Sequence, residues 1–226
     1  MIKLSKRMRQ AAEQVDREKT YSLQEAVESI EKFPKVKFDE TVELHFMLNI
    51  DTKSSDQSIR GTVLLPHGTG KNVRIAVFCK GEQEQKAKEA GADDVGAEEL
   101  IEKVSKGFMD FDVVIATPDM MRDLSKLGKI LGPRGMMPTP KAGTVSADVA
   151  KAIREVKAGK IEFKSDKQAG IHVIVGKRSF PKEKLLENAT HLIEAINHAK
   201  PASVKGNLLK NVFLSTTMGP GLKVAL

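Results

Sequence analysis

The chain has 226 residues, 40% of them hydrophobic, which is enough to bury a core in one large domain or two small ones. Its formal net charge of +7 favours a polyanionic partner, such as nucleic acid or an anionic membrane surface, although a soluble protein can carry this charge without one. The one cysteine, Cys79, excludes an internal disulfide and a cysteine metal cluster, and it fits a reducing, cytoplasmic setting.

The excess positive charge is concentrated in the last third of the sequence. Residues 160–226 carry 11 basic and 5 acidic side chains, whereas residues 1–67 carry 11 of each and residues 68–159 carry 15 and 14. Aromatic residues amount to 4%, with no Trp, so stacking on bases would fall to a few Phe side chains. No window approaches 18 apolar residues and the N-terminus lacks an apolar stretch, so neither a membrane span nor a signal peptide is expected.

The first 67 residues are predicted to form two helices and two strands. Ser5–Lys19 has the charge pattern of a helix, and the capping box Ser22-Leu-Gln-Glu25 begins a second helix that ends near Lys32. Apolar and polar residues alternate over Thr41–Ile50, which predicts a strand buried on one face only. Gly61–Leu65 is predicted to pair back as a further strand.

The middle of the chain has a different pattern, in which short, wholly apolar segments alternate with helices. Strands are expected at Val73–Phe78 and Phe111–Ala116. Helices are expected at Gln83–Ala90, Glu98–Lys106, Asp119–Leu127 and, capped by Ser146, Ala147–Val156. Apolar strands of this kind are buried on both faces, so the middle is predicted to be an α/β layer with a parallel sheet.

After Gly159 the chain returns to strands that flank one long helix. Strands are expected at Ile161–Lys164, Gly170–Gly176 and Leu208–Thr217, with the helix at Pro181–His198. Strands at both ends suggest a discontinuous terminal domain, residues 1–67 and 160–226, with residues 68–159 inserted into it. The predicted fold class is α+β for the terminal domain and three-layer α/β, Rossmann-like, for the insertion, although two consecutive domains fit almost as well.

No enzymatic or metal site is indicated by the motifs. Gly68-Thr-Gly-Lys71 resembles part of a phosphate loop, but Leu65 stands where that loop needs its first glycine and Asn72 where it needs Ser or Thr. The five histidines lack metal-ligand spacing, and no Ser or Cys stands in a nucleophile motif. We therefore expect no catalytic residue, no metal and no cofactor.

A long segment rich in Gly and Pro, residues 124–147, is the first candidate for contact with nucleic acid. It contains no acidic residue, and Met136 and Met137 would add adaptable apolar contacts. Its basic side chains are Lys126, Lys129, Arg134 and Lys141. Long structureless loops are uncommon in compact domains and are usually functional, although an ordinary surface connection is the alternative.

The second candidate is Lys35–Glu43, at the start of the first strand, with the core Lys37-Phe-Asp-Glu-Thr-Val-Glu43. Lys35 and Lys37 would bind phosphate, and Phe38 would stack on a base or pack at the rim. Thr41 and Glu43 share the polar face of the strand. A carboxylate repels phosphate, but it can accept a hydrogen bond from a ribose 2′-OH, a contact that favours RNA over DNA. The alternative is that Phe38 belongs to the core and Glu43 is simply solvated.

The third candidate is Ser215-Thr-Thr-Met-Gly-Pro220, where the last predicted strand ends. Its short hydroxyl side chains offer hydrogen bonds without bulk, and Gly219 would let a backbone approach closely. From these residues alone, a routine exit from a strand explains the segment as well.

These segments together resemble the bacterial form of the large-subunit ribosomal protein one family, the protein of the mobile stalk beside the transfer-RNA exit site. The match also rests on one motif outside these segments, Arg60-Gly-Thr-Val-Leu-Leu-Pro-His-Gly-Thr-Gly-Lys71. Within the first segment it is carried by Leu127-Gly-Lys-Ile-Leu-Gly-Pro-Arg-Gly-Met-Met-Pro-Thr-Pro-Lys141. The resemblance covers nearly the whole chain in the expected order. It implies two domains, the first built from both chain ends and the second inserted.

The resemblance also implies a structural, ribosomal function. By motif position, the terminal domain would bind ribosomal RNA through Lys37, Phe38, Thr41, Glu43, Lys164, Lys167, Ser215, Thr217, Met218 and Gly219. A secondary contact, to ribosomal RNA or the departing transfer RNA, would come from Lys126, Lys129, Arg134 and Lys141. Gly68 and Gly159 are the expected hinge. The family further implies repression of its own messenger RNA through a leader that mimics the ribosomal site, and we expect a monomer outside the ribosome.

Two other classes of function compete with this one. A small α/β enzyme would need a phosphate loop or an acid–base constellation, and neither motif is present. A general DNA-binding protein would be expected to carry a helix-turn-helix or zinc module, and low affinity for duplex DNA would dismiss it.

Overall fold

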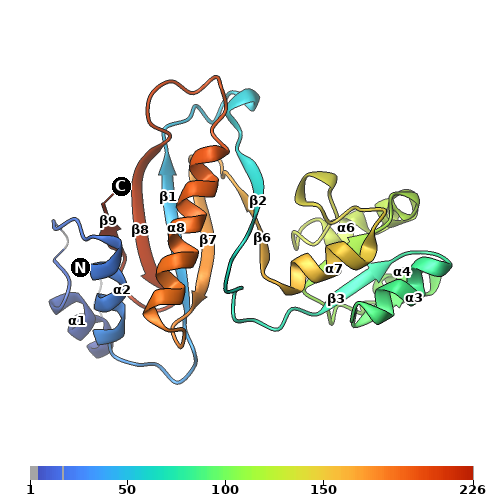
Figure 1. Ribbon diagram of the computed structural model, residues 1–226, viewed down its shortest axis with the longest axis horizontal. Helices are drawn as coiled ribbons and strands as arrows, with labels where there is room; N and C mark the ends of the chain where they lie inside the picture. Colours follow the sequence, from blue (N-terminus) through green and yellow to red (C-terminus); the bar gives the residue numbers. More distant parts are fainter. Residues whose placement is uncertain (1–4, 17, 226) are drawn as a thin grey trace. The chain divides into compact units, whose positions relative to one another are not determined.

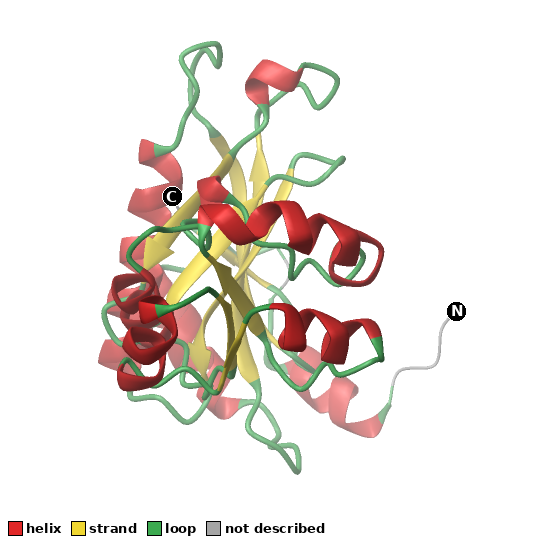
Figure 2. Cartoon of the chain, turned by 90° about the vertical axis from the view of Figure 1, so that its right-hand side faces the viewer, coloured by secondary structure: helices red, strands yellow, loops and turns green. Residues whose placement is uncertain are grey.

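The computed structural model describes residues 5–16 and 18–225, and the chain divides into two compact units (Figure 1). Unit 1 consists of both chain ends, Met1–Gly70 and Glu162–Leu226, and unit 2 is the middle, Lys71–Ile161. Figure 2, coloured by secondary structure, shows helices and strands intermixed along the chain. This confirms the mixed α/β character expected from the sequence.

Unit 1 is built on a four-stranded antiparallel sheet. Its strands are β1 (Thr41–Leu48), β7 (Gly170–Lys177), β8 (Leu209–Thr216) and β9 (Leu222–Val224), in the order β7-β1-β8-β9. The predicted alternation of β1 is confirmed, because Val42, Leu44 and Phe46 are buried while the residues between them are partly exposed. One face of the sheet therefore carries the core and the other faces outward.

Two helices, α2 (Leu23–Lys32) and α8 (Lys182–His198), pack on the core face of this sheet and against each other (Figure 1). The predicted capping box is confirmed: Ser22 Oγ accepts from Glu25 N at 3.2 Å, and Glu25 Oε2 accepts from Ser22 N at 3.2 Å. Their buried side chains include Val27, Ile30, Leu185, Leu192 and Ile196. Burial of each such side chain contributes about 1.5–3 kcal/mol, so this layer is the main source of stability for unit 1.

The first helix is shorter than predicted. α1 covers Lys6–Glu13 rather than Ser5–Lys19, whose Arg17 lies outside the described residues. The helix ends because the chain turns to meet Tyr21: Asp16 N donates to the Tyr21 hydroxyl at 2.9 Å, and Tyr21 pairs with Val224 at the end of β9. A second, two-stranded ladder joins β2 (Arg60–Leu64) to β6 (Lys160–Lys164).

Unit 2 contains a parallel three-stranded sheet, as its apolar runs predict. The strands are β3 (Ile75–Phe78), β4 (Asp94–Gly96) and β5 (Val113–Ala116), in the order β4-β3-β5. Alternate residues of β3 enter two separate cores. Ile75 and Val77 pack with α3 (Glu82–Glu89) and α7 (Val149–Lys157), and Ala76 and Phe78 pack with α4 (Glu98–Ser105), α5 (Met121–Leu124) and α6 (Gly128–Leu131). Helices thus cover both faces of this sheet.

Two helix predictions for unit 2 were wrong in detail, and two short strands, β4 in unit 2 and β9 in unit 1, were not predicted. The helix expected over Asp119–Leu127 is broken into short turns, Pro118–Met120, α5 and Ser125–Leu127, because packing of Met120, Leu124 and Leu127 into the core overrides regular helix geometry. Asp148, not Ser146, caps α7; Ser146 N is still paired with Ala116 O at 3.1 Å, so the helix begins later. The three-residue strands β4 and β9 were too short to show periodicity.

We predict that Asn188→Ala lowers the free energy of unfolding of unit 1 by about 2–4 kcal/mol, because three polar backbone groups would lose their partner. Asn188 is fully buried on α8; its Nδ2 donates to Gly68 O at 3.0 Å and to Val175 O at 2.8 Å, and its Oδ1 accepts from His67 N at 3.1 Å. Urea unfolding followed by fluorescence of Tyr21 reports on unit 1, because the chain has one Tyr and no Trp.

The exposed Asn197, on the same helix, supplies the matched control. Asn197→Ala is expected to leave the urea midpoint almost unchanged. Equal midpoints for the two variants would show that the Asn188 amide does not fasten the 67–68 segment to the helix.

Candidate nucleic-acid interface

The outward face of the unit 1 sheet carries polar side chains with apolar ones between them. In the register of the sheet, Glu43 of β1 lies between Ile174 and Ser215, and His45 lies between His172 and Phe213. Large apolar side chains on this face remain exposed, including Met47 at 44%, Ile174 at 39% and Phe213 at 37%. A β-bulge between Val42 and Glu43 breaks the regular pairing with β7 at the start of this face. Such a surface is suited to a partner rather than to bulk water.

At one end of the face, the predicted segments around Thr41 and Thr217 are brought together. Thr217 N donates to Thr41 O at 3.0 Å, and Thr217 Oγ1 accepts from Thr41 N at 3.0 Å. Lys177 Nζ donates to Thr41 Oγ1 at 3.0 Å, so the three elements β1, β7 and β8 meet here. Ser215 and Glu43 lie opposite each other one step further along the same face. The sequence predicted these residues separately, and the fold places them in one site.

Beneath this end lies Glu40, a carboxylate with 1% of its surface exposed. Its Oε2 accepts from Arg178 Nη1 at 2.6 Å, and its Oε1 accepts from Thr216 Oγ1 and from Met218 N, both at 3.1 Å. The Glu40 carbonyl also accepts from Arg178 N at 2.8 Å. One buried carboxylate thus ties the segment before β1 to the segments after β7 and β8.

Arg178 extends this network to the end of α2. Its Nη2 donates to Phe33 O at 2.5 Å and Glu31 O at 3.4 Å, and its Nη1 donates to Pro34 O at 3.5 Å. Both charges are therefore paired and their remaining hydrogen-bonding atoms are largely used, which is the condition for a buried ion pair to be tolerated. The exposed loops of the site are held in place before any partner arrives.

The predicted side chains at the tip of the site point outward. Phe38 is 54% exposed and Met218 is 47% exposed, so Phe38 is not a core residue. Lys37 and Thr217 are also exposed, and Thr41 and Glu43 are half-buried. Gly219 is required by close packing, because a Cβ there would overlap Thr216 Oγ1, which donates to Glu40.

A line of hydrogen-bonded side chains crosses the middle of the face. His45 Nδ1 lies 2.9 Å from His172 Nδ1, and His45 Nε2 lies 2.8 Å from Ser215 Oγ. His172 Nε2 lies 3.5 Å from the carboxylate of Asp166. Partial burial, and then the neighbouring His172, lower the pKa of His45, against the opposing charge of Glu43. Backbone hydrogen bonds, first from Gly170 N, lower the pKa of Asp166.

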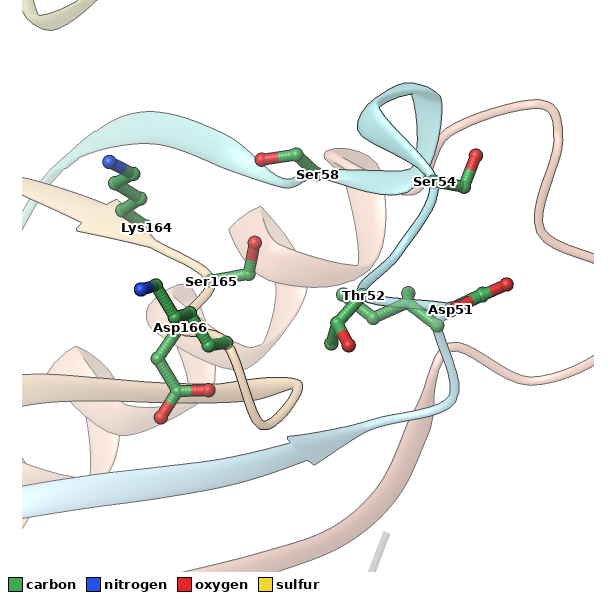
Figure 3. Close-up of a pocket in the computed structure, with 9 residues that line it drawn as sticks. Asp51, Thr52, Ser54, Ser58, Lys164, Ser165 and Asp166 are labelled. Carbon is green, nitrogen blue, oxygen red and sulfur yellow. The ribbon is translucent and has the colours of Figure 1, made fainter.

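The predicted lysines Lys164 and Lys167 lie away from Thr41, towards the opposite end of β1. They line an open hollow together with Asp51, Thr52, Ser54 and Ser165, among others (Figure 3). Strand β1 has 8 residues, and seven steps of about 3.3 Å separate its two ends by roughly 23 Å. The residues expected to contact RNA therefore form two groups, one at each end of the face.

The basic segment of unit 2 was expected to be a structureless loop, and that expectation was wrong. It contains the turn Ser125–Leu127, α6 and the turn Pro140–Ala142, because Leu127 and Leu131 anchor it in the core. Met136 and Met137 are partly buried and pack against the same core. Its basic residues are nevertheless all exposed: Lys126, which pairs with Asp123 at 3.1 Å, Lys129, Arg134 and Lys141.

The glycines expected at the hinge, Gly68 and Gly159, both have a positive φ, 64° and 103°. The division between the units falls at Gly70–Lys71 and at Ile161–Glu162, so each glycine lies just before a boundary. Gly68 is fixed within unit 1, because its carbonyl accepts from Asn188 and its N donates to Leu65 O at 3.1 Å.

Two residues central to the site, Glu40 and Arg178, were missed in the sequence. The alternation of β1 held a signal for Glu40: it has the same parity as Val42 and Leu44, so the pattern places a carboxylate on the core face. A buried carboxylate needs a partner, but nothing in the sequence identified Arg178 as that partner.

Among residues 5–16 and 18–225, no group of three or more His, Cys, Asp or Glu side chains is arranged to hold a metal ion. Within the same residues, no helix combines the length and apolar character needed to cross a membrane.

An uncovered, polar sheet face beside preorganised loops and exposed basic residues is typical of proteins that bind RNA. The chain belongs to the ribosomal protein L1p/L10e family, whose family model matches residues 30–220. The chain is therefore a ribosomal protein and not an enzyme, as expected from the resemblance, and its place is the ribosome.

Curated relatives are similar over almost their whole length. The large ribosomal subunit protein uL1 of Thermosipho melanesiensis is 58% identical over 225 residues, covering 99% of this chain and 97% of the relative. The uL1 protein of Kosmotoga olearia is 53% identical, covering 99% of this chain and 97% of the relative. That of Protochlamydia amoebophila is 56% identical, covering 98% of this chain and 94% of the relative. The resemblance noted in the sequence is confirmed.

We predict that Arg178→Met lowers the free energy of unfolding of unit 1 by about 3–5 kcal/mol, because Glu40 would remain buried without its charge partner. The pair is 11% and 1% exposed, so solvent cannot compensate for the loss. Urea unfolding monitored by Tyr21 measures the change.

Lys182 provides a control in the same region, since it pairs with Glu31 on the surface at 3.0 Å. Lys182→Met is expected to cause a much smaller change, because an exposed pair is screened by water. If both variants unfolded at the urea midpoint of the parent chain, the ion pair would not be what fixes the site.

Proposed function

We propose that this chain is a constituent of the large ribosomal subunit that binds the ribosomal RNA of the mobile stalk through the outward sheet face of unit 1. The observation that carries the proposal is the bracing of Thr41, Thr217 and Met218 by the buried pair of Glu40 and Arg178. A surface whose loops are already fixed loses little conformational entropy when a structured RNA docks on it. Family membership supports the ribosomal part of the proposal.

The chemistry of the face suits RNA better than DNA. Glu43 and the hydroxyls of Ser215 and Thr217 offer acceptors for ribose 2′-OH groups and base amino groups. Lys37 would contact phosphate, and Phe38, exposed beside it, would stack on an unpaired base. Gly219 keeps the loop compact enough for the backbone to approach the RNA. These groups read shape and 2′-OH positions rather than phosphate charge alone.

The second group, Lys164 and Lys167, would contact phosphates further along the same RNA. The hydroxyls that line the hollow in Figure 3 would bind the water around a sugar–phosphate backbone, whereas the carboxylates of Asp51 and Asp166 would repel its phosphates towards the two lysines. This contact is electrostatic, so it would add affinity without adding sequence preference.

We assign the two units to the two expected domains: a terminal RNA-binding domain, residues 1–67 and 160–226, and an inserted Rossmann-like domain, residues 68–159. The inserted domain would make a secondary contact with ribosomal RNA or the exiting transfer RNA through Lys126, Lys129, Arg134 and Lys141. Rotation at the connections near Gly68 and Gly159 would allow the insertion to follow the transfer RNA as it leaves.

Two further roles follow from the same site. By assisting the departure of deacylated transfer RNA, the chain would act in translation itself. By binding a leader of its own messenger RNA that mimics the ribosomal site, the free protein, as a monomer, would repress its own synthesis.

The overall proposal is tested by titrating the protein with folded stalk RNA and with duplex DNA of equal length, each at two salt concentrations. A preference for RNA that persists at the higher salt concentration supports readout of shape and 2′-OH groups. Equal and strongly salt-dependent binding to both nucleic acids would instead show a generic basic protein.

We predict that Thr217→Ala weakens binding of stalk RNA by about 1–3 kcal/mol, since the change removes a hydroxyl at the RNA surface and the acceptor for Thr41 N. Filter binding or calorimetry at a fixed salt concentration measures the loss. Thr190 is an exposed threonine on α8, and Thr190→Ala should leave the affinity unchanged. Wild-type affinity of the Thr217 variant would place this residue outside the interface.

We also predict that changing Lys126, Lys129, Arg134 and Lys141 together to Gln flattens the salt dependence of binding to ribosomal RNA or transfer RNA. The slope of log K against log salt should fall in magnitude by about 0.7–0.9 for each phosphate that the variant no longer neutralises. Changing Lys86, Lys88, Lys103 and Lys106 to Gln removes the same charge from exposed positions on other helices of unit 2. Identical slopes in the two quadruple variants would show that the four residues act only through the net charge of the protein and make no direct contact with the RNA.

A further inference from the structure

The hydrogen-bonded line across the sheet face contains two imidazole rings in direct contact. Its members are Asp166, His172, His45 and Ser215, which lie on the turn before β7, on β7, on β1 and on β8. The rings are tilted by 57° with centroids 5.0 Å apart, so they meet through their nitrogen atoms rather than by stacking.

When both imidazole rings are neutral, one arrangement of hydrogens gives every contact along the line a donor and an acceptor. The Asp166 carboxylate also accepts from Gly170 N and Gln168 N, both at 2.7 Å, and its Oδ2 lies 3.5 Å from His172 Nε2, which favours a hydrogen on that nitrogen. His172 Nδ1 is then an acceptor, so His45 must donate from Nδ1. His45 Nε2 in turn accepts the hydroxyl proton of Ser215, and the lone pairs of Ser215 Oγ face outward. The face then presents an acceptor at Ser215 beside the carboxylate of Glu43.

One added proton reverses the direction of the line. It enters the pair at His172 Nδ1, the atom that faces His45, because partial burial and the neighbouring ring lower the pKa of His45. His172 then donates from both nitrogens, so His45 accepts at Nδ1 and donates from Nε2 to Ser215 Oγ. The Ser215 hydroxyl keeps its hydrogen, which no longer points at His45 and turns outward. The same side chain has changed from an acceptor to a donor.

We propose that the paired rings of His45 and His172 are positioning residues that set the hydrogen-bonding polarity of Ser215 towards bound RNA. The inference rests on the proposed RNA-binding function and deepens it. When both rings are neutral, Ser215 and Glu43 can both accept from a 2′-OH or a base amino group held between them. When the pair takes up a proton, Ser215 becomes a donor and the RNA group loses one of its two acceptors. RNA binding by this face is therefore weakened at lower pH, although the protein becomes more positively charged.

The charged groups that act on the pair are few. Glu43 Oε2, on β1, lies 3.9 Å from His45 Nε2, and Asp166 faces His172 from the turn before β7. From β8 the neighbour is the uncharged Ser215, and on β9 Lys223 lies opposite Phe213, one strand further away. The Glu43 carboxylate opposes the lowering of the pKa of His45, and the contact between the two rings limits the pair to one added proton.

The test is the affinity of the full chain for folded stalk RNA at pH 8.0 and pH 5.5, at constant ionic strength. The wild-type protein is expected to bind about 5–10-fold more weakly at pH 5.5, the effect of about one hydrogen bond. His172→Gln removes one ring of the pair, and Ser215→Ala removes the group that the pair controls, so each variant should lose affinity by less than twofold over the same range. His191→Gln, at an exposed position on α8, should keep the wild-type dependence on pH.

A second readout needs no RNA. Nitrogen-15 NMR of the free protein at pH 8.0 should show His45 protonated on Nδ1 only and His172 on Nε2 only. Stalk RNA binding that is tight, sensitive to Thr217→Ala and independent of pH would overturn the inference and leave the proposed function standing. Absence of specific RNA binding at either pH would instead overturn the proposed function, whereas the opposite tautomers in the free protein would overturn the inference alone.

Discussion

The contact between Glu40 and Arg178 determines the position of nearly every exposed group at the end of the sheet face. Removing a charge from water costs several kcal/mol, and the mutual attraction of a pair repays this only when their other polar atoms are also bonded. Here Glu40 is bonded to Thr216 and Met218 N as well as to Arg178, whose Nη2 reaches Phe33 O at the end of α2. The network therefore joins three segments that are distant from one another in the chain.

The position of this ion pair also explains why the site tolerates such short side chains. Thr41, Thr217 and Gly219 cannot reach far towards a partner, so the backbone that carries them must be placed accurately. The buried pair supplies that accuracy from beneath, and α2 and α8 hold the core side of the same strands. The stability of unit 1 and the shape of its outward face thus depend on the same buried groups. A substitution that destabilises these groups would also disturb the face.

Much of the fold was predictable because it depends on local periodicity. The alternation of β1, the capping box at Ser22 and the apolar run of β3 each specify their element within a few residues. Prediction was wrong where burial overrides composition: the glycines and prolines of residues 126–141 indicated a loop, yet Leu127 and Leu131 draw the segment into short helices. Those leucines stand four residues apart, a helical spacing that was outweighed by the Gly and Pro content.

The candidate site was predictable residue by residue but not as an arrangement. Only the register of three strands places Glu43 opposite Ser215. That register cannot be deduced locally, because pairing between the two ends of a chain depends on long-range packing.

A carboxylate, two imidazoles and several hydroxyls on one open face make a poor surface for attracting phosphate by charge. These side chains offer many hydrogen-bond acceptors, but phosphate oxygens are acceptors themselves and cannot donate to them. An RNA partner supplies the missing donors through its 2′-OH and base amino groups, and a DNA duplex has no 2′-OH. The basic side chains lie around the face, at Lys37 and at Lys164 and Lys167, where on the proposed function they would strengthen the encounter without deciding what fits in the centre. Selectivity on this surface would then be a matter of matching donors to fixed acceptors, and the hydrogen positions along the histidine line would set one of those acceptors.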